Sequence, residues 1–487
     1  MMYRILIIIV IYILFLSASD NKRKAMGNIQ LAFPDLESQI NLYQRAGNNA
    51  GLITNDSLNW MKIKTASLNE NGTNRRYWDA RQLQYNFISY RGQKHLSADM
   101  VFYGEIQYIW DNRYGVNQAI EKEPYASDPF VLSDSTSGNF SYSGPKIYIA
   151  FNQQLTSSFY YGIGLHYSIN NGLKNKFTRP EIISRNIALS IDFLYKMTPA
   201  MSLGFSFKPY QNLEDTKNVN QPDRTTPVTY SYRGEYEFRK RISSFDRTAE
   251  YTGYEIVFPQ LSLAGKRLES VVFAVYGFKQ TDISDRIFTI RYKEGYHQGE
   301  YYFGCLTSRY YLNHERQTSL AVNYHFKYFE DWASEPKNKL LLYESFMTQH
   351  EILLGFANTA NRFLEFAIEG YYSAGSPDKK DYLAKIYRNG TIELFGVRGG
   401  INCNINSALA LRAGIEYQSH HEAEIWDYFG DYKGVTGSAG FGFYGNTFEL
   451  EGYFSYGKMK RKEPALYVKS ARYRENLDIE LQLKSYF

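Results

Sequence analysis

Large apolar residues alternate with small or polar residues along most of this chain. In residues 201–208 every odd position is large and apolar, and every even position is small or polar. The same period of two recurs over 159–168, 187–197, 318–328 and 409–418. Because successive side chains of a β-strand point to opposite faces, this period predicts strands with one apolar face.

The length of the strands and the rhythm of their connections favour a transmembrane barrel over a soluble β-sandwich, whose strands also alternate. The predicted strands run for roughly ten residues, longer than the mode of soluble sheets and long enough to cross a bilayer at a tilt. Tyr and Phe recur at strand ends, as in the aromatic girdles of such barrels. Tight connections, as at 155–157 and 406–407, alternate with long polar ones, as at 112–143 and 210–250. Short periplasmic turns and long extracellular loops produce this alternation.

Dividing the chain at these connections predicts an all-β fold, a transmembrane antiparallel β-barrel of about 18 strands, with 14 or 16 left open. Both chain ends are then periplasmic, so the number of strands should be even. Residues 228–240 and 285–296 also alternate, and we interpret them as extensions of extracellular hairpins. The predicted strands are 58–68, 80–91, 97–111, 144–155, 158–168, 186–197, 201–209, 252–263, 269–280, 298–312, 318–330, 343–357, 362–373, 390–405, 408–420, 434–445, 447–459 and 473–487.

The composition narrows the class of protein further. A chain of 487 residues is too long for one ordinary globular domain, but a large β-barrel can form a single domain of this length. The mean hydropathy of −0.45 excludes a bundle of membrane helices, whereas 45 Tyr and 32 Phe suit strands and membrane interfaces. The net charge of +5 gives no sign of nucleic-acid binding, so we expect no nucleic acid as a partner.

The two cysteines exclude a disulfide framework and a thiolate zinc cluster. Cys305 and Cys403 fall on predicted strands about four apart, which is about 19 Å at the usual strand spacing. A disulfide needs Cα atoms within about 7 Å of each other. We therefore expect both cysteines to stay unpaired.

The first residues have the order of a secretory signal peptide. Arg4 precedes an uninterrupted apolar stretch from Ile5 to Leu16, and small residues follow at 17–19. We therefore expect a signal peptide at 1–19, an N-terminal periplasmic or lumenal segment at 20–57, and the outer-membrane β-barrel at 58–487. The alternative, a retained N-terminal anchor, would need a longer apolar stretch to span a membrane.

The end of the chain is a strand whose two faces differ sharply. Leu477, Ile479, Leu481, Leu483 and Phe487 share one face, and polar residues occupy most of the other. This strand resembles the C-terminal insertion signal of Gram-negative outer-membrane barrels, which the barrel-assembly machinery reads, although Ser485 stands where an aromatic residue is commoner. The resemblance implies that Ile479, Leu481, Leu483 and Phe487 form an insertion signal. It also implies that the assembly machinery is a partner during biogenesis and that the protein lies in the cell outer membrane.

Two shorter motifs resemble elements of known families. Residues 48–52, Asn-Asn-Ala-Gly-Leu, resemble the Asn-Pro-Ala-Gly-Leu element that follows the N-terminal hatch of the fatty-acid-channel family, with Asn49 in place of Pro. In that family the hatch sits in the lumen and hydrophobic compounds pass sideways to the bilayer. Residues 128–134, Asp-Pro-Phe-Val-Leu-Ser-Asp, resemble a motif of an uncharacterised family of outer-membrane barrels, and residues 178–180, Thr-Arg-Pro, fit it loosely.

The face opposite the apolar one is predicted to line the lumen, and it carries many charges. A buried charge needs water or a partner, so the interior is either a wet channel or a salt-bridged contact with a plug. Gly162, Gly164 and Gly204 on this face leave room for close approach. Acidic residues outnumber basic ones, so an open lumen should prefer cations. The predicted lumen-facing charges are acidic at Asp192, Glu365, Glu369, Glu416, Glu449, Glu451, Asp478 and Glu480, and basic at Lys196, Lys208, Arg412 and Lys484.

A basic run lies at the top of a predicted strand. Lys458, Lys460, Arg461 and Lys462 are candidate contacts for the phosphates of lipopolysaccharide, because clustered cations satisfy phosphate oxygens well. Residues 239–241 form a second basic run of the same kind. The alternative for both runs is a solvated extracellular loop.

The chain shows no distinct catalytic constellation. Residues 420–421 form a His-His pair, but adjacent residues on a strand point to opposite faces and make a poor chelate. A barrel lipase would need a Ser-His pair and a barrel protease an acidic dyad, and neither stands out among the abundant Ser, Asp and Glu. We therefore expect no enzyme, no cofactor and no bound metal.

Two hypotheses for the function remain. The first is an integral outer-membrane barrel that acts as a channel or binding protein for small solutes, with outer-membrane lipid and lipopolysaccharide as its surroundings. The second is a scaffold or accessory subunit of an outer-membrane transport, secretion or assembly complex, with another outer-membrane protein as its partner. Barrel architecture serves both. A continuous lumen favours the first hypothesis, and a plugged lumen with an apolar periplasmic or loop surface favours the second.

Overall fold

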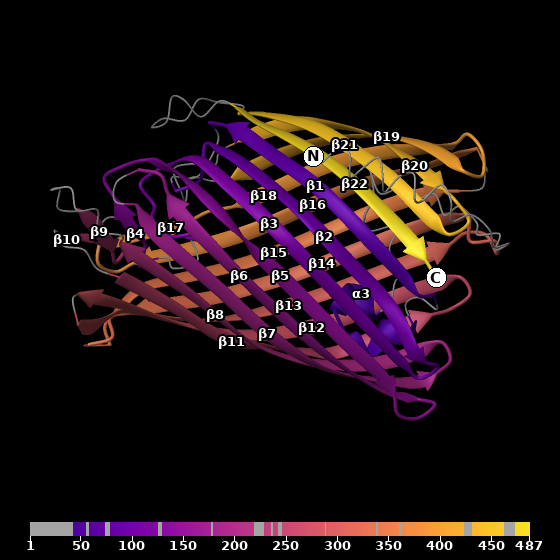
Figure 1. Cartoon of the computed structure of the whole chain (residues 1–487), viewed down its shortest axis with the longest axis horizontal. Coiled ribbons are helices and arrows are strands. Elements are labelled where there is room, and N and C mark those ends of the chain that lie inside the picture. Colours follow the sequence, from indigo (N-terminus) through magenta and orange to yellow (C-terminus); the bar gives the residue numbers. More distant parts are fainter. Residues whose placement is uncertain are drawn as a thin grey trace.

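The computed structural model describes residues 42–54, 58–73, 78–124, 129–176, 179–218, 228–234, 237–241, 246–287, 289–337, 339–359, 363–422, 431–461 and 473–487. These residues form a closed antiparallel β-barrel of 18 tilted strands (Figure 1). The barrel closes where β1 (Trp60–Gly72) pairs with β22 (Tyr473–Tyr486) along its whole length. The predicted fold class and the even strand number are confirmed.

Each of the 18 predicted segments corresponds to one barrel strand, and most strands are longer than predicted. The added residues lie largely at the rim with the long connections, here called the extracellular rim. Polar and charged residues such as Arg291 and Lys293 extend the strands there, where an apolar face is no longer required. The other barrel strands are β2 (Gln82–Ser97), β3 (Met100–Val116), β5 (Gly138–Gln154), β6 (Phe159–Lys174), β7 (Pro180–Thr198), β8 (Met201–Asn218), β11 (Asp246–Ala264), β12 (Leu268–Ile287), β13 (Ile290–Tyr311), β14 (Thr318–Ser334), β15 (Leu341–Asn358), β16 (Leu364–Asp381), β18 (Ile392–Asn404), β19 (Leu409–Glu422), β20 (Tyr432–Tyr444) and β21 (Phe448–Arg461).

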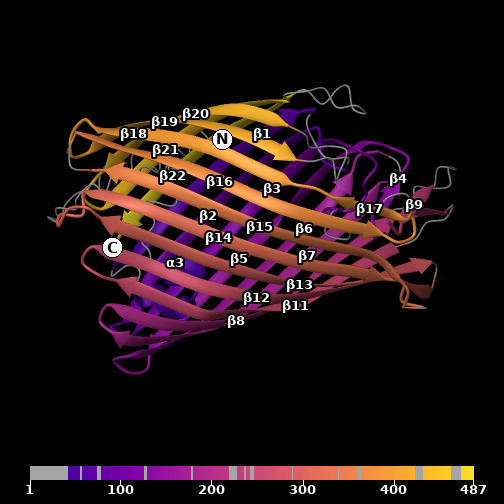
Figure 2. The ribbon, with the colours of Figure 1, turned by 180° about the vertical axis from the view of Figure 1, so that it is seen from behind.

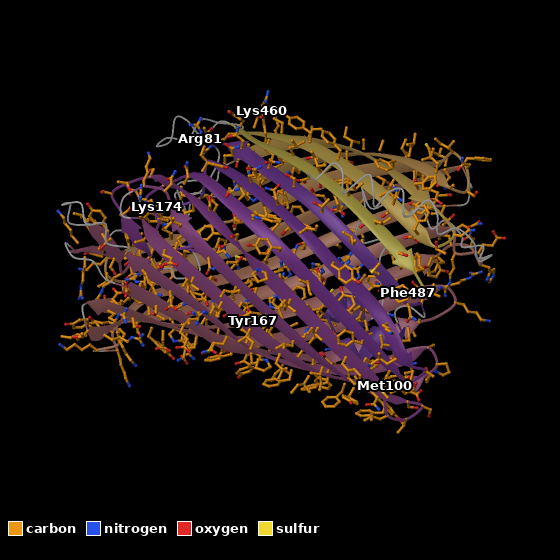
Figure 3. All side chains as sticks on the ribbon, in the orientation of Figure 1. Arg81, Met100, Tyr167, Lys174, Lys460 and Phe487 are labelled. Atoms are coloured by element: carbon orange, nitrogen blue, oxygen red, sulfur yellow. The ribbon has the colours of Figure 1, made fainter. Side chains whose placement is uncertain are left out.

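The two faces of the barrel wall differ as the alternation predicts. Large apolar side chains are exposed on the outside of nearly every strand, for example Ile106, Leu165, Ile187 and Ile415. Polar side chains point inward and many are buried, among them Ser206, which is fully buried. A continuous apolar exterior around a polar interior is the arrangement that lets a barrel sit in lipid. In Figure 3 side chains project outward along the visible edges of the barrel, and the labelled Tyr167 lies between the two rims.

A charge on the outer face should therefore destabilise the barrel far more than the same charge on the inner face. Leu165 on β6 is paired with Ile149 and Leu189, which are also exposed to the outside. Leu165→Arg should lower the free energy of unfolding by roughly 2–4 kcal/mol if this layer lies near the bilayer midplane. The inward-facing neighbour variant His166→Arg is the control and should lower it much less. Urea unfolding in lipid vesicles measures both, and equal losses would refute the assignment of faces on β6.

A small three-stranded sheet lies at the extracellular rim. It consists of β4 (Leu132–Asp134), β9 (Thr229–Tyr232) and β10 (Phe238–Arg241), in the order β4-β9-β10. A further short strand, β17 (Ile386–Asn389), extends the rim by pairing with β16. Figure 2 shows β4, β9 and β17 together at the end of the barrel away from the C-terminus. The alternation over 228–240 was interpreted as an extension of an extracellular hairpin, whereas β9 and β10 pair with each other and belong to a separate sheet with β4. The pairing of β9 with β4 joins two different connections and was not predicted.

A short helical segment lies inside the barrel near the opposite, periplasmic rim (Figure 1). It comprises the α-helix α3 (Leu42–Ala46) and the 3-10 helix η1 (Asn49–Thr54). Among the described residues, no helix is long and apolar enough to cross a membrane. The predicted signal peptide and residues 20–41 lie outside the described residues.

The two cysteines are both free, as expected. Cys305 lies on β13 and Cys403 on β18, with β14, β15 and β16 between these strands. The predicted separation of four strands is therefore confirmed.

Candidate functional site

Residues Leu42–Thr54, here called the docked segment, rest against one side of the inner wall. Leu42 and Ala46 on α3 are buried in a cluster with Tyr160, Leu194 and Val257 of the wall. On η1, fully buried Leu52 belongs to a second cluster with the β3 residue Val101 and the β5 residue Ala150. Helix α3 contacts β11 and β12, and η1 contacts β3, β5, β6 and β7. The docked segment therefore covers the wall from β3 to β12.

Asn48 connects the docked segment to three strands. Its Nδ2 donates to the Gln260 side-chain oxygen of β11 at 2.6 Å, to the Phe193 carbonyl of β7 at 3.0 Å and to the Phe205 carbonyl of β8 at 3.4 Å. Its Oδ1 accepts a hydrogen bond from the Ala50 backbone N–H at 2.9 Å, which shapes the turn into η1. Because Asn48 is fully buried, these bonds satisfy an amide that would otherwise be costly to bury.

Asn49 makes a second set of contacts with β5 and β7. Its Nδ2 donates to the Asp192 carboxylate at 2.8 Å, and its Oδ1 accepts from the Tyr148 hydroxyl at 2.5 Å. The side chain of Asn152 donates to the Ala50 carbonyl at 2.8 Å. The predicted lumen-facing Asp192 is thus fully buried and holds the docked segment.

Three glycines of the wall make this close approach feasible. A Cβ atom added to Gly162 would lie 2.4 Å from the Ala50 backbone nitrogen, and one added to Gly164 would lie 2.6 Å from the Asn49 Nδ2. A Cβ atom at Gly204 would lie 2.7 Å from the Asn48 Nδ2. The room that these glycines leave on the lumen face is occupied by Asn48, Asn49 and Ala50.

The end of α3 is also held by the wall. Gly47 adopts a positive φ of 62°, a conformation that suits glycine after a helix. The predicted lumen-facing Lys208 donates from its Nζ to the Ala46 carbonyl at 3.1 Å. A cation at the C-terminal end of the helix satisfies a carbonyl that has no partner within the helix.

At the extracellular rim the first long connection folds inward and is fixed by buried ion pairs. Lys174 is fully buried and donates to both oxygens of Asp134, at 2.8 and 2.7 Å, and to the Thr136 carbonyl at 2.7 Å. Figure 3 labels Lys174 at this rim. Asp134 is the last residue of the motif at 128–134, whose first residue, Asp128, lies outside the described residues.

Arg247 of β11, three strands further along the wall than Lys174, holds the same connection. Its Nε donates to Asp285 at 2.8 Å, and its Nη1 donates to the Phe130 carbonyl at 2.6 Å and to Glu121 at 3.3 Å. Phe130 is buried with Ile283, Ala333 and Tyr343, among others, and its ring packs on Gly295. The motif at 128–134 therefore anchors the in-folded loop, a long-range role that its local sequence did not indicate.

A pocket of about 600 Å³ lies between this in-folded loop and the wall formed by β22, β1, β2, β3 and β5. Its charged lining includes Glu70, Arg81, Asp111, Arg113 and Arg474, and Trp78, Tyr85 and Tyr142 supply aromatic rings. Lys122 and Glu123 of the loop close one side. Arg113 joins the loop to the wall. It pairs with Asp111 of β3 at 2.9 Å, and it also contacts the loop through Glu123 at 3.0 Å and the Lys122 carbonyl at 2.6 Å. Sequence analysis had not singled out these residues.

The predicted lumen charges on the wall opposite the docked segment, from β16 to β22, are paired or hydrogen-bonded with neighbours. Three ion pairs join Arg398 to Glu369 at 2.5 Å, Arg412 to Glu451 at 2.9 Å and Lys64 of β1 to Glu480 at 2.7 Å. The other four carboxylates accept hydrogen bonds: Glu365 from Asn402, Glu416 from Tyr371, Glu449 from Tyr486 and Asp478 from Ser455. The remaining bases also have contacts, since Lys196 donates to the Tyr160 hydroxyl at 2.7 Å and Lys484 lies over the Trp60 ring.

Two of the candidate lipopolysaccharide contacts, Lys458 and Lys460, share the exposed outer face of β21. Lys458 pairs with Glu475 on the neighbouring strand. Lys460 is exposed at the extracellular rim (Figure 3), whereas Arg461 is half-buried. Lys462 lies outside the described residues. Contact with lipopolysaccharide stays a prediction, as does the insertion role of Ile479, Leu481, Leu483 and Phe487.

The two adjacent histidines make separate contacts. His420 stacks on Tyr432 with ring centroids 4.6 Å apart, and His421 bonds Asp431. Within the described ranges, no group of three or more His, Cys, Asp or Glu could hold a metal ion.

The apolar exterior, polar interior and closed strand order define a β-barrel of the outer-membrane type. The chain belongs to the family of unknown function DUF6850, whose model matches residues 49–425. That range includes residues 128–134 and 178–180, in which Thr178 lies outside the described residues. The expected membership of an uncharacterised family is confirmed, whereas the resemblance of residues 48–52 to the fatty-acid-channel family is not shown. A comparison with curated proteins gives no match.

Solved structures with a similar fold are outer-membrane receptors and transporters. The siderophore receptor PiuA from Acinetobacter baumannii aligns with a TM-score of 0.44 and 9% identity over 88% of this chain and 82% of that chain. The outer membrane transporter YddB from Escherichia coli aligns with a TM-score of 0.43 and 8% identity over 88% and 80%. The ferric citrate transporter FecA, in its unliganded form, aligns with a TM-score of 0.45 and 8% identity over 88% and 78%. Structural similarity at such low sequence identity does not indicate which solute this protein binds.

Proposed function

We propose that this protein is an outer-membrane β-barrel that binds small solutes and lets them pass across the membrane, without catalysis. The observation that carries the proposal is the pocket of about 600 Å³ between the inner wall and the in-folded loop. A pocket of this volume, with apolar rings and a few placed charges, suits a small molecule. A solute bound there lies within the lumen.

Placement in the outer membrane rests on the exterior of the barrel and on the sequence at its two ends. The apolar outer face needs lipid around it, and a closed barrel is the one β-structure that leaves no open edge in lipid. The expected signal peptide at 1–19 and the terminal strand that resembles an insertion signal agree with export to that membrane.

The docked segment narrows the route that a solute takes. It contacts β3, β5, β6, β7, β11 and β12, whereas the charged residues from β16 to β22 lie on the opposite side of the strand order. Charges that are paired along a wall can still hydrogen-bond water and polar solutes. We infer that polar solutes move along this charged wall, past the docked segment.

Ion conductance in planar bilayers tests the proposal. Wild-type protein should conduct, and Gly162→Leu should raise the conductance severalfold, because its new side chain occupies the place of Ala50 and displaces the docked segment. Gly370→Leu is the matched control: a Cβ atom there meets nothing within 4 Å, so its conductance should equal that of the wild type.

The same recordings separate the two functional hypotheses. Reversal potentials should show a modest cation preference, which shrinks at 1 M salt because screening shortens to about 3 Å. The preference is modest because ion pairs neutralise Glu369, Glu451 and Glu480. If both the wild type and Gly162→Leu fail to conduct, the accessory-subunit hypothesis replaces the channel.

A further inference from the structure

The wall of the pocket places apolar and aromatic side chains beside charged ones on neighbouring strands. Leu68 on β1 pairs with Tyr85 on β2, which pairs with Asp111 on β3. In the next inward-facing row, Glu70 pairs with Leu83, which pairs with Arg113. Because neighbouring strands are about 4.8 Å apart, Tyr85 and Leu83 each have a charged residue at about that distance on the next strand.

Four charges of this wall, on β1, β3 and β22, are already paired with one another. Asp111 is almost fully buried and bonds Arg113, which also bonds Glu123 of the loop at 3.0 Å, and Arg474 pairs with Glu70. A ligand with a net charge would have to compete with one of these pairs. A hydroxyl group can accept a hydrogen bond from a guanidinium and donate one to a carboxylate, so it can join a pair without breaking it.

Two aromatic side chains that are not fully buried complete this surface. Trp78 and Tyr85 line the pocket, and both have an apolar ring and a polar group. A sugar ring has apolar C–H faces and a rim of hydroxyl groups, so it matches a wall in which rings and aliphatic side chains lie between paired charges. We propose that this pocket binds a short neutral oligosaccharide. The inference rests on the proposed function and names the solute class that it serves.

Equilibrium binding to the full-length protein in lipid nanodiscs tests this assignment. The probes are a panel of neutral trisaccharides built from glucose, mannose, galactose or xylose, compared with trigalacturonic acid, a chitosan trimer and trilysine. At least one neutral trisaccharide should quench tryptophan fluorescence saturably, and it should bind more tightly than every charged probe. This comparison is made on the wild type, so it does not depend on whether a variant folds.

Matched aromatic variants locate the site. Trp78→Ala and Tyr85→Ala should each weaken trisaccharide binding by about tenfold, the loss expected for one well-packed aromatic contact. Trp110→Ala and Tyr108→Ala are the controls, because both side chains are exposed on the outer face of β3. Binding is measured by calorimetry, since Trp78 is itself a fluorophore, and heat-modifiable migration verifies that each variant is folded.

The outcomes separate this inference from the proposed function. If the protein conducts but binds no neutral trisaccharide, the inference is wrong and the proposed channel function still stands. The same conclusion follows if the protein conducts but binds a charged probe more tightly than every neutral trisaccharide. Equal binding by the pocket variants and the controls also overturns the inference. Trisaccharide binding that is lost in Trp78→Ala and Tyr85→Ala, in a protein that does not conduct, supports the site and removes passage from the proposed function.

Discussion

Removal of residues 478–487 should leave a protein that cannot form a closed barrel in the membrane. These residues pair with Trp60–Leu68 of β1 on one side and with Phe448–Ser455 of β21 on the other. Without them both strands become open edges, whose unpaired N–H and C=O groups cost several kcal/mol each in lipid. The predicted loss of folded protein is therefore nearly complete.

Heat-modifiable migration and protease protection in the membrane fraction measure this loss. Lys484→Ala is the control within the same strand, because its side chain contacts the Trp60 and Tyr486 rings but its backbone pairing is unchanged. Phe487→Ala isolates the insertion signal, because it keeps the backbone pairing of β22, and it should also abolish membrane insertion. Normal heat-modifiable migration of the truncated protein would contradict both the closure of the barrel by β22 and the insertion role.

The barrel could be predicted from the sequence because lipid imposes one requirement on every strand. Each outward residue must be apolar whatever its neighbours are, so the two-residue period is visible locally, as at Ile187 and Leu189. Most of the extracellular extensions were missed because that requirement ends where the bilayer ends. The segment 285–296 is the exception: it still alternates, and the expected hairpin extension is confirmed by residues 285–287 of β12 and 290–296 of β13.

The contacts inside the barrel could be predicted only in part. Glycines at 162, 164 and 204 signalled a close approach, but nothing local showed that Asn48 and Asn49 would fill the space. Lys174 and Arg247 are ordinary charged residues in the sequence, and their partners Asp134 and Asp285 are many residues away. Partners brought together by closure of the barrel leave no periodic signal along the chain.

The net charge of the lumen could also be predicted only in part from the sequence. A count of residues predicts an acidic interior, but pairing across strands reduces its field. Arg398 lies directly opposite Glu369 in the register of β16 and β18, so correct pairing of that hairpin alone reveals the ion pair. Arg412 instead reaches Glu451 past β20, where Gly440 and Gly442 stand opposite these two residues. That contact requires the side-chain volumes of three strands to be considered together.

Replacement of Arg247 by Met should release the in-folded loop from the extracellular mouth. The Arg247 side chain is 1% exposed and joins Asp285, Glu121, the Phe130 carbonyl and Ser231. Removing the guanidinium takes the Arg247 cation away from two buried carboxylates, a change that typically costs about 3–5 kcal/mol. The loop should then become sensitive to protease added outside intact cells, and hydrogen exchange at Phe130–Asp134 should accelerate.

A neighbouring arginine and a second substitution show whether buried charge is the cause. Arg286→Met removes an arginine whose side chain is 53% exposed and which pairs with Asp246, so it should change stability by at most about 1 kcal/mol. Adding Asp285→Asn to Arg247→Met should restore part of the lost stability, because it removes one of the carboxylates that lost the Arg247 cation. Equal protease sensitivity of Arg247→Met and Arg286→Met would show that the loop is not held by Arg247. A double variant no more stable than Arg247→Met would show that the loss comes from the hydrogen bonds to Phe130 and Ser231, and not from buried charge.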